Sequence, residues 1–138
     1  MSVVPPRDIC ERTLDYALRA VDLFDHLQNS QNRAGWIIGN QYLRAATSIG
    51  ANMEEAQGGE SRSDFAHKCA IALKEVRESL FWLRLLERAA IVPPPRLAPL
   101  IQETRELIAI LTTIVVKTKR PFLPRLPVLL FSIFSFLL

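Results

Sequence analysis

The sequence predicts an all-α fold, an antiparallel up-down-up-down four-helix bundle that assembles into a homo-oligomer. Apolar residues recur at the three- and four-residue spacing of amphipathic helices in four long segments, at about residues 9–28, 36–57, 62–90 and 97–119. Short connections join these segments, so successive helices should pack side by side in opposite directions. No segment alternates apolar and polar residues between hairpin turns, and we therefore expect no sheet. Residues 1–120 form the predicted bundle, and residues 121–138 form a separate tail.

The first helix is expected between about Ile9 and Gln28, after a short arm that contains Pro5 and Pro6. One face of this segment is small or apolar and should meet the core: Cys10, Thr13, Ala17, Ala20, Val21, Phe24 and Leu27. The opposite side carries charges of alternating sign, which is typical of a solvated helix face. The polar residues 29–35 form a loop.

The second helix, from about Trp36 to Gln57, is the segment around which we expect the bundle to be organised. Its core face carries residues at helical spacing: Ile38, Tyr42, Ala45, Ala46, Ile49, Met53 and Ala56. The adjacent side is small or polar: Gln41, Arg44, Ser48, Ala51, Asn52 and Glu55. Gly50 lies inside the helix, where Gly costs about 1 kcal/mol relative to Ala, so we expect another helix to approach closely there. The alternative is that Gly50 only weakens the helix.

The third helix begins at Ser61, with Asp64 three residues later, a start that resembles a capping box. Its main seam should face the core: Phe65, Cys69, Ala72, Val76, Ser79, Leu83 and Leu86. A second apolar set lies on another side and has Glu78 among its members: Ile71, Trp82 and Leu85. A monomer would expose this set, so it predicts a partner surface. The alternative is that Trp82 packs under a loop or an end of the same bundle.

The fourth helix is expected from about Leu97 to Lys119, after a stiff turn at residues 92–96. Its core face carries residues at helical spacing: Leu100, Ile101, Thr104, Leu107, Ile108, Leu111, Ile114 and Val115. In the tail, prolines recur every third residue from Pro121, and residues 128–138 are apolar apart from two serines. This run is shorter than the roughly 20 apolar residues that a spanning helix needs. The favoured interpretations are a segment that packs on the bundle or on a neighbouring chain, and a non-native extension from a shifted reading frame; a membrane contact is the least favoured.

Composition narrows the class of protein. The chain has 138 residues, enough for one domain, and a formal net charge of +3, which permits nucleic-acid binding without requiring it. We expect Cys10 and Cys69 to be buried as small apolar residues rather than joined in a disulfide. The N-terminal residues 1–11 lack the apolar run of a signal peptide, so we expect a cytoplasmic protein.

No motif in the sequence predicts catalysis, a bound metal or a cofactor. Gly58 and Gly59 follow a helix and lack the Lys-Ser/Thr pair of a phosphate-binding loop. Neither cysteine has a plausible set of histidine partners. Asp64 and His67 form a single Asp-x-x-His, which is too little for the di-metal centres that some four-helix bundles hold. We therefore expect a protein that is not an enzyme.

A basic stripe on the third helix is the best candidate for binding. Its cations fall within about one quadrant at 100° per residue, with Phe81 among them and no acid: Lys74, Arg77, Arg84 and Arg88. The end of the fourth helix adds three more: Lys117, Lys119 and Arg120. Such a stripe could follow a phosphate backbone with little sequence specificity. The alternative is an ordinary solvated helix face.

Two motifs carry a family resemblance. The first is R-A-A-T-S-I-G-A-N at 44–52, followed by Glu55 and Ala56. The second block comprises Asp64-Phe65, Ile71–Glu75, Glu78, Trp82-Leu83 and Leu85-Leu86, and Glu106-Leu107 and Ile110-Leu111 then precede Lys117. Over roughly residues 14–120 the chain resembles the four-helix-bundle family of 23S ribosomal RNA intervening-sequence proteins. The accessory variability proteins of diversity-generating retroelements are similar to that family.

The resemblance implies a homo-oligomer in the form of a pentameric barrel. It also implies a non-catalytic accessory protein that binds structured RNA or DNA, together with a nucleic-acid enzyme such as a reverse transcriptase. The alternative function is a protein-binding or self-assembling module that binds no nucleic acid. The expected oligomer interface combines residues of the second and third helices: Arg44, Ser48, Asn52, Glu55, Ile71, Glu78, Trp82 and Leu85. Within this set, Arg44 should pair with Glu55 or Glu78 of the same or a neighbouring chain.

Overall fold

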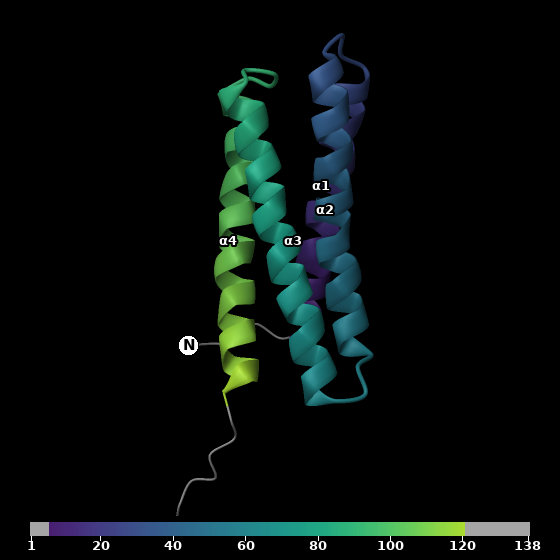
Figure 1. Cartoon of the computed structure of the whole chain (residues 1–138), viewed down its shortest axis with the longest axis vertical. Coiled ribbons are helices and arrows are strands. Elements are labelled where there is room, and N and C mark those ends of the chain that lie inside the picture. Colours follow the sequence, from purple (N-terminus) through teal and green to yellow (C-terminus); the bar gives the residue numbers. More distant parts are fainter. Residues whose placement is uncertain (1–5, 121–138) are drawn as a thin grey trace, which may run out of the picture.

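Four helices make up the part of the chain that the computed structural model describes, residues 6–120, and this part contains no strand. They are α1 (Pro6–Gln28), α2 (Arg33–Gln57), α3 (Arg62–Arg88) and α4 (Pro94–Lys119). The α1–α2 and α3–α4 loops lie at one end of the molecule and the α2–α3 loop lies at the other (Figure 1). Helix α2 packs against α1 and α3, and α3 packs against α4, which gives a helical bundle. The interpretations of the tail at 121–138 concern residues outside the described part.

None of the four described helices combines the length and the apolar composition that a membrane crossing requires. Each helix instead has one face in the core and another in solvent, as an amphipathic helix of a bundle does.

Three helix starts lie earlier than the sequence pattern indicated. Helix α2 begins at Arg33 rather than Trp36, because the Asn32 side chain accepts a hydrogen bond of 2.9 Å from the backbone N–H of Gly35 and caps the helix. The expected stiff turn at 92–96 is wrong in part, since α4 already begins at Pro94. Proline suits the first helical turn because its φ is preset and the N–H that it lacks would have no partner there. The same reasoning explains why α1 begins at Pro6.

The C-terminal end of α3 is set by backbone conformation. The helix ends at Arg88, two residues before the expected Ala90. Ala90 has a φ of 54°, in the left-handed region, which interrupts the helical path. At the other end of α3, Ser61 accepts a hydrogen bond of 3.1 Å from the backbone N–H of Asp64, so the predicted cap is confirmed.

The predicted core face of α2 is confirmed, with Ile38 alone only half-buried. Its buried members are Tyr42, Ala45, Ala46, Ile49, Met53 and Ala56. Gly50 lies against α1, and a Cβ atom built on it would stand 3.4 Å from the backbone oxygen of Thr13. The close approach expected at Gly50 is therefore present, and α1 and α2 meet backbone to backbone at this point.

The buried face of α1 is rotated relative to the prediction. Val21 was expected in the core but is 41% exposed, whereas Tyr16, which the prediction placed on no face, is fully buried. The reason lies in α4: the Tyr16 hydroxyl lies 2.7 Å from the Thr104 hydroxyl, so the ring turns inward and satisfies its polar end there. The Tyr16 ring also meets Tyr42 edge to face, with centroids 6.4 Å apart.

Polar contacts join the first helix to the last. The Arg12 guanidinium donates to both carboxylate oxygens of Glu103, at 2.6 and 3.0 Å, and to Glu106 at 2.9 Å. These charge-assisted bonds lie beside the Tyr16–Thr104 contact along the α1–α4 seam. The hydrogen bond from Arg12 holds the pKa of Glu103 below its ordinary value of 4.5.

The two central tyrosines give a matched stability test. The Tyr42 hydroxyl is buried and has no hydrogen-bond partner among the described residues, whereas that of Tyr16 is bonded to Thr104. We expect Tyr16→Phe to lower the free energy of unfolding by about 1 kcal/mol, and Tyr42→Phe to leave it unchanged or raise it, because an unpaired buried hydroxyl is destabilising. Urea unfolding measures both. A loss in Tyr42→Phe equal to that in Tyr16→Phe would show that the Tyr42 hydroxyl is bonded.

The Glu103 contact predicts a pH-dependent effect. A carboxyl whose pKa is lower in the folded chain stabilises the fold above the unfolded pKa and loses this contribution as the pH falls through the folded pKa. Glu103→Gln should therefore lower the free energy of unfolding by about 1 kcal/mol at neutral pH. The difference from the wild type should shrink as the pH is lowered below 4.5. Glu106→Gln is the control, because that more exposed partner of Arg12 should matter less; a deficit in Glu103→Gln that does not change with pH would contradict the assignment.

Candidate nucleic-acid interface

The four cations of the α3 stripe, Lys74, Arg77, Arg84 and Arg88, are all exposed on the outer side of the helix. None of them makes a hydrogen bond or ion pair within residues 6–120. Phe81 stands among them and is 57% exposed. The structure therefore presents a row of cations that face solvent rather than carboxylates of their own chain.

The three cations at the end of α4 form a separate group. Lys117 and Lys119 are exposed in the last turn of α4, and Arg120 follows directly. The Arg62 guanidinium donates to the backbone oxygen of Lys117, which places this group beside the start of α3. Arg84 and Arg88 lie near the opposite end of α3, about 30 Å or more away at 1.5 Å of rise per residue. The α4 group is thus not continuous with the C-terminal half of the stripe.

The predicted interface residues of α2 and α3 line one outer seam of the bundle, and two ion pairs cross it. Arg44 pairs with Glu78 of the same chain at 2.9 Å, and Lys68 pairs with Glu55. Arg44 was expected to pair with Glu55 or Glu78, and it pairs with Glu78 of its own chain. Because both partners of that pair are partly exposed, it contributes little to stability by itself.

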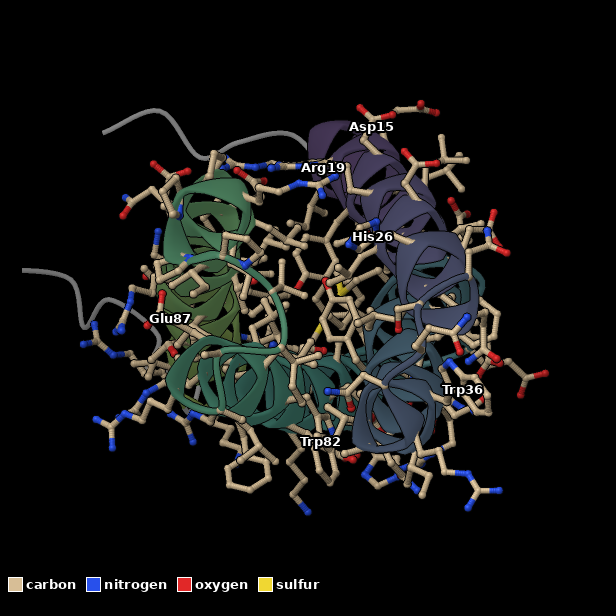
Figure 2. The ribbon with its side chains drawn as sticks, turned by 90° about the horizontal axis from the view of Figure 1, so that it is seen from above. Asp15, Arg19, His26, Trp36, Trp82 and Glu87 are labelled. Atoms are coloured by element: carbon tan, nitrogen blue, oxygen red, sulfur yellow. The ribbon has the colours of Figure 1, made fainter. Side chains whose placement is uncertain are left out.

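The remaining interface candidates lie along the same seam. Ser48 donates to the backbone oxygen of Arg44, and the Asn52 amide donates to the backbone oxygen of Ser48. The three apolar candidates are each half-buried: Ile71, Trp82 and Leu85. The Trp82 indole N–H donates to Glu78 over 3.1 Å, and the side chain packs against the core of its own chain. Trp82 lies near the place where α2 and α3 meet (Figure 2).

Two exposed apolar features were missed by the sequence reasoning. Ile37, 66% exposed, continues the side of α2 that carries Arg44 and Ser48. On α1, three exposed residues at i, i+4 and i+7 form an apolar stripe: Leu14, Leu18 and Val21. A hollow of about 550 Å³ between α1 and α2 adjoins this stripe at Val21. The sequence does contain the signal for this stripe, because Leu14, Leu18 and Val21 are spaced as one face of a helix. It was missed because Val21 was assigned to the core face.

A cleft lies between α1 and α4, near the α3–α4 loop. It has a volume of about 240 Å³, and its lining mixes charges of both signs with an apolar floor: Arg19, Asp22, Leu23, His26, Val92, Arg96, Leu97 and Leu100. Arg19 and His26 lie on the side of α1 that faces α4 (Figure 2), and a nitrogen of His26 stands 3.4 Å from the Arg96 guanidinium. The charged lining of the cleft comprises two arginines and one aspartate, so the cleft is weakly basic.

The described residues contain no group of three or more metal-binding side chains. Cys10 and Cys69 are both buried free thiols, as predicted. Burial raises the pKa of Cys69 to about 11, and burial together with Glu54 and Glu11 raises that of Cys10. Both thiols are therefore protonated at neutral pH, a state in which cysteine is a poor nucleophile.

Comparison with known proteins shows that the chain is similar to members of one family. The family model described as 23S rRNA-intervening sequence protein matches residues 7–113. Among solved structures, the crystal structure of a protein with unknown function from the S23 ribosomal protein family of Bacteroides thetaiotaomicron VPI-5482 is similar, with a TM-score of 0.76 and 34% sequence identity. That match covers 81% of this chain and 98% of the other. No curated protein matches the chain.

Proposed function

This chain belongs to the family of 23S rRNA-intervening sequence proteins, and we propose that it is a non-catalytic, oligomeric accessory protein that binds structured RNA or DNA. The observation that carries the proposal is the α3 stripe. Its four cations are exposed and engage no carboxylate of the described chain, so they are available to phosphates. Contacts of this kind read the charge of the backbone rather than the sequence of the bases.

The accessory role follows from what the site can and cannot do. The stripe offers phosphate contacts, and it contains no acid, base or nucleophile arranged for chemistry. A nucleic-acid enzyme such as a reverse transcriptase, acting in the cytoplasm, would supply the reaction, and this protein would hold or present the nucleic acid. A module that binds only protein is the alternative, and it predicts no salt-sensitive binding to RNA or DNA.

We propose that the bundle has the antiparallel up-down-up-down order and that several copies, five by the family resemblance, form a ring. Loops at alternating ends of the molecule support the helix order. A ring needs two unlike surfaces on each copy, one for each neighbour. The α2–α3 seam with exposed Ile37 and the α1 stripe with Leu18 are two such surfaces, and both offer apolar area that a monomer leaves in water.

The nucleic-acid proposal is tested by titrating the full chain against a labelled structured RNA and a matched DNA duplex, using fluorescence anisotropy at several salt concentrations. If the four stripe cations contact phosphates, affinity should fall roughly 100-fold between 50 and 200 mM salt. Arg84→Gln with Arg88→Gln should weaken binding and flatten the salt dependence. Arg33→Gln with Arg105→Gln removes the same charge from exposed positions outside the stripe and should leave binding nearly intact. Equal losses in both double variants, or no binding at low salt, would refute the proposal.

The assembly proposal is tested by sedimentation of the wild type and of single variants, with circular dichroism to follow helix content. Ile37→Glu and Leu18→Glu should each give smaller species with unchanged helix content, because both side chains are more than half exposed in one chain. Trp82→Asp should give monomers or insoluble protein. Val116→Glu, at an exposed apolar position of α4, is the control and should sediment as the wild type does. A monomeric wild type, or an oligomer that survives both substitutions to Glu, would overturn the assignment.

A further inference from the structure

Phe81 is an aromatic ring left in solvent on the stripe that the proposed function uses. It is 57% exposed, although its neighbour Trp82 is packed against the core. The two rings meet edge to face, with centroids 4.9 Å apart at 72°. This contact restricts the orientation of the Phe81 ring, while the solvent side of that ring remains uncovered. An exposed phenyl group lacks the hydrophobic stabilisation that burial would give it, and a bound ligand that covers it would supply that stabilisation. The side chains around Phe81 indicate the chemical class of such a ligand.

A shallow hollow of about 220 Å³ lies beside the ring, lined by Phe81, Arg84, Leu85 and Arg88. This volume is below the roughly 300 Å³ at which ligand pockets for drug-sized molecules begin. A single flat ring system is the kind of group that such a hollow can accommodate against Phe81 and Leu85. Its walls are apolar where they meet the ring and cationic at the rim.

The cations at the rim are not engaged elsewhere. Arg84 and Arg88 make no hydrogen bond or ion pair within residues 6–120. Among the acids of α3 closest to the stripe, Glu78 is already paired with Arg44. Glu87, which follows Arg84 by three residues, forms no ion pair with either arginine within residues 6–120. Arg84 and Arg88 follow Phe81 by three and seven residues, the spacing at which side chains lie along one face of a helix. Arg77 precedes Phe81 by four residues on the same face.

We infer that Phe81 is a stacking platform for an unpaired base, with Arg77, Arg84 and Arg88 contacting the phosphates that flank it. The inference rests on the proposed function and narrows its ligand to unpaired nucleotides of a loop, bulge or junction. Bases inside a duplex are covered on both faces by their neighbours, so away from the duplex ends only an unpaired base can stack on an exposed ring. The stripe then combines salt-dependent phosphate contacts with one stacking contact that requires the base to be unpaired.

The test compares two labelled RNAs that share one stem, a hairpin with a large unpaired loop and a blunt duplex of equal charge. The full wild-type chain should bind the hairpin more tightly. Phe81→Ala should weaken hairpin binding about tenfold and duplex binding less than about twofold, since stacking is lost while phosphate contacts remain. For the same reason Phe81→Ala should keep the salt slope of the wild type, whereas Arg84→Gln should reduce it by about 1. Phe81→Trp, which keeps an aromatic face, should retain hairpin affinity.

Val116→Ala is the matched control, because Val116 on α4 is 48% exposed and lies outside both the basic stripe and the two proposed assembly surfaces. The control should change neither the affinity for the hairpin nor the affinity for the duplex. Sedimentation should show that Phe81→Ala and the control variant both keep the wild-type assembly. If hairpin and duplex bind equally and Phe81→Ala changes neither, the stacking inference fails while the basic stripe stands. If neither RNA binds at low salt, the proposed function fails as well. If Phe81→Ala weakens both RNAs equally, Phe81 supports the stripe and is not a platform for unpaired bases.

Discussion

The close packing of α2 against its two neighbours is the constraint on which the rest of the bundle depends. Gly50 and the small residues Ala45 and Ala46 let adjoining backbones approach more closely than larger side chains would permit. The approach to α1 is backbone to backbone, at the carbonyl of Thr13. Because α2 holds α1 on one side and α3 on the other, the outward faces of those two helices are fixed as well. The apolar stripe of α1 and the basic stripe of α3 are consequences of this placement.

The same placement separates two kinds of surface on α3. The side toward α2 is occupied by interactions within the chain: the Arg44–Glu78 ion pair and the indole N–H of Trp82 bonded to Glu78. The outward side beside it carries the four cations of the stripe, none of which is paired with an acid of the described chain. Glu78 stands between them and is neutralised by Arg44, so its charge subtracts little from the basic stripe. An ion pair of small energetic value thus matters for the electrostatics of the neighbouring face.

Sequence periodicity predicted the four helices, the core face of α2, the close approach at Gly50 and the Ser61 cap, because each of these depends on local spacing. It failed on α1, where spacing placed Val21 in the core and left Tyr16 unassigned. Tyr16 is buried with its hydroxyl bonded to that of Thr104 on α4, a contact that the spacing within α1 does not reveal. In the candidate site, the cations of α3 were found from spacing alone. Spacing also placed Phe81 on that stripe. It did not predict that Trp82 beside it would be half-buried, since this depends on how far α3 is rotated toward α2.

The pattern of helix contacts also bears on how the chain folds. The packed pairs α1–α2, α2–α3 and α3–α4 join helices that are adjacent in sequence, so each can form as a hairpin soon after its two segments exist. The α1–α4 seam is different, because its polar contacts join residues 88 to 94 positions apart. Closing the chain over that separation carries a larger entropic cost. Burial of the apolar core that α1 and α4 share offsets this cost, together with the polar contacts of Arg12 and Tyr16. We expect the α1–α4 seam to be the last part of the bundle to form and the first to open. Opening of this seam should therefore require less free energy than unfolding of the whole bundle.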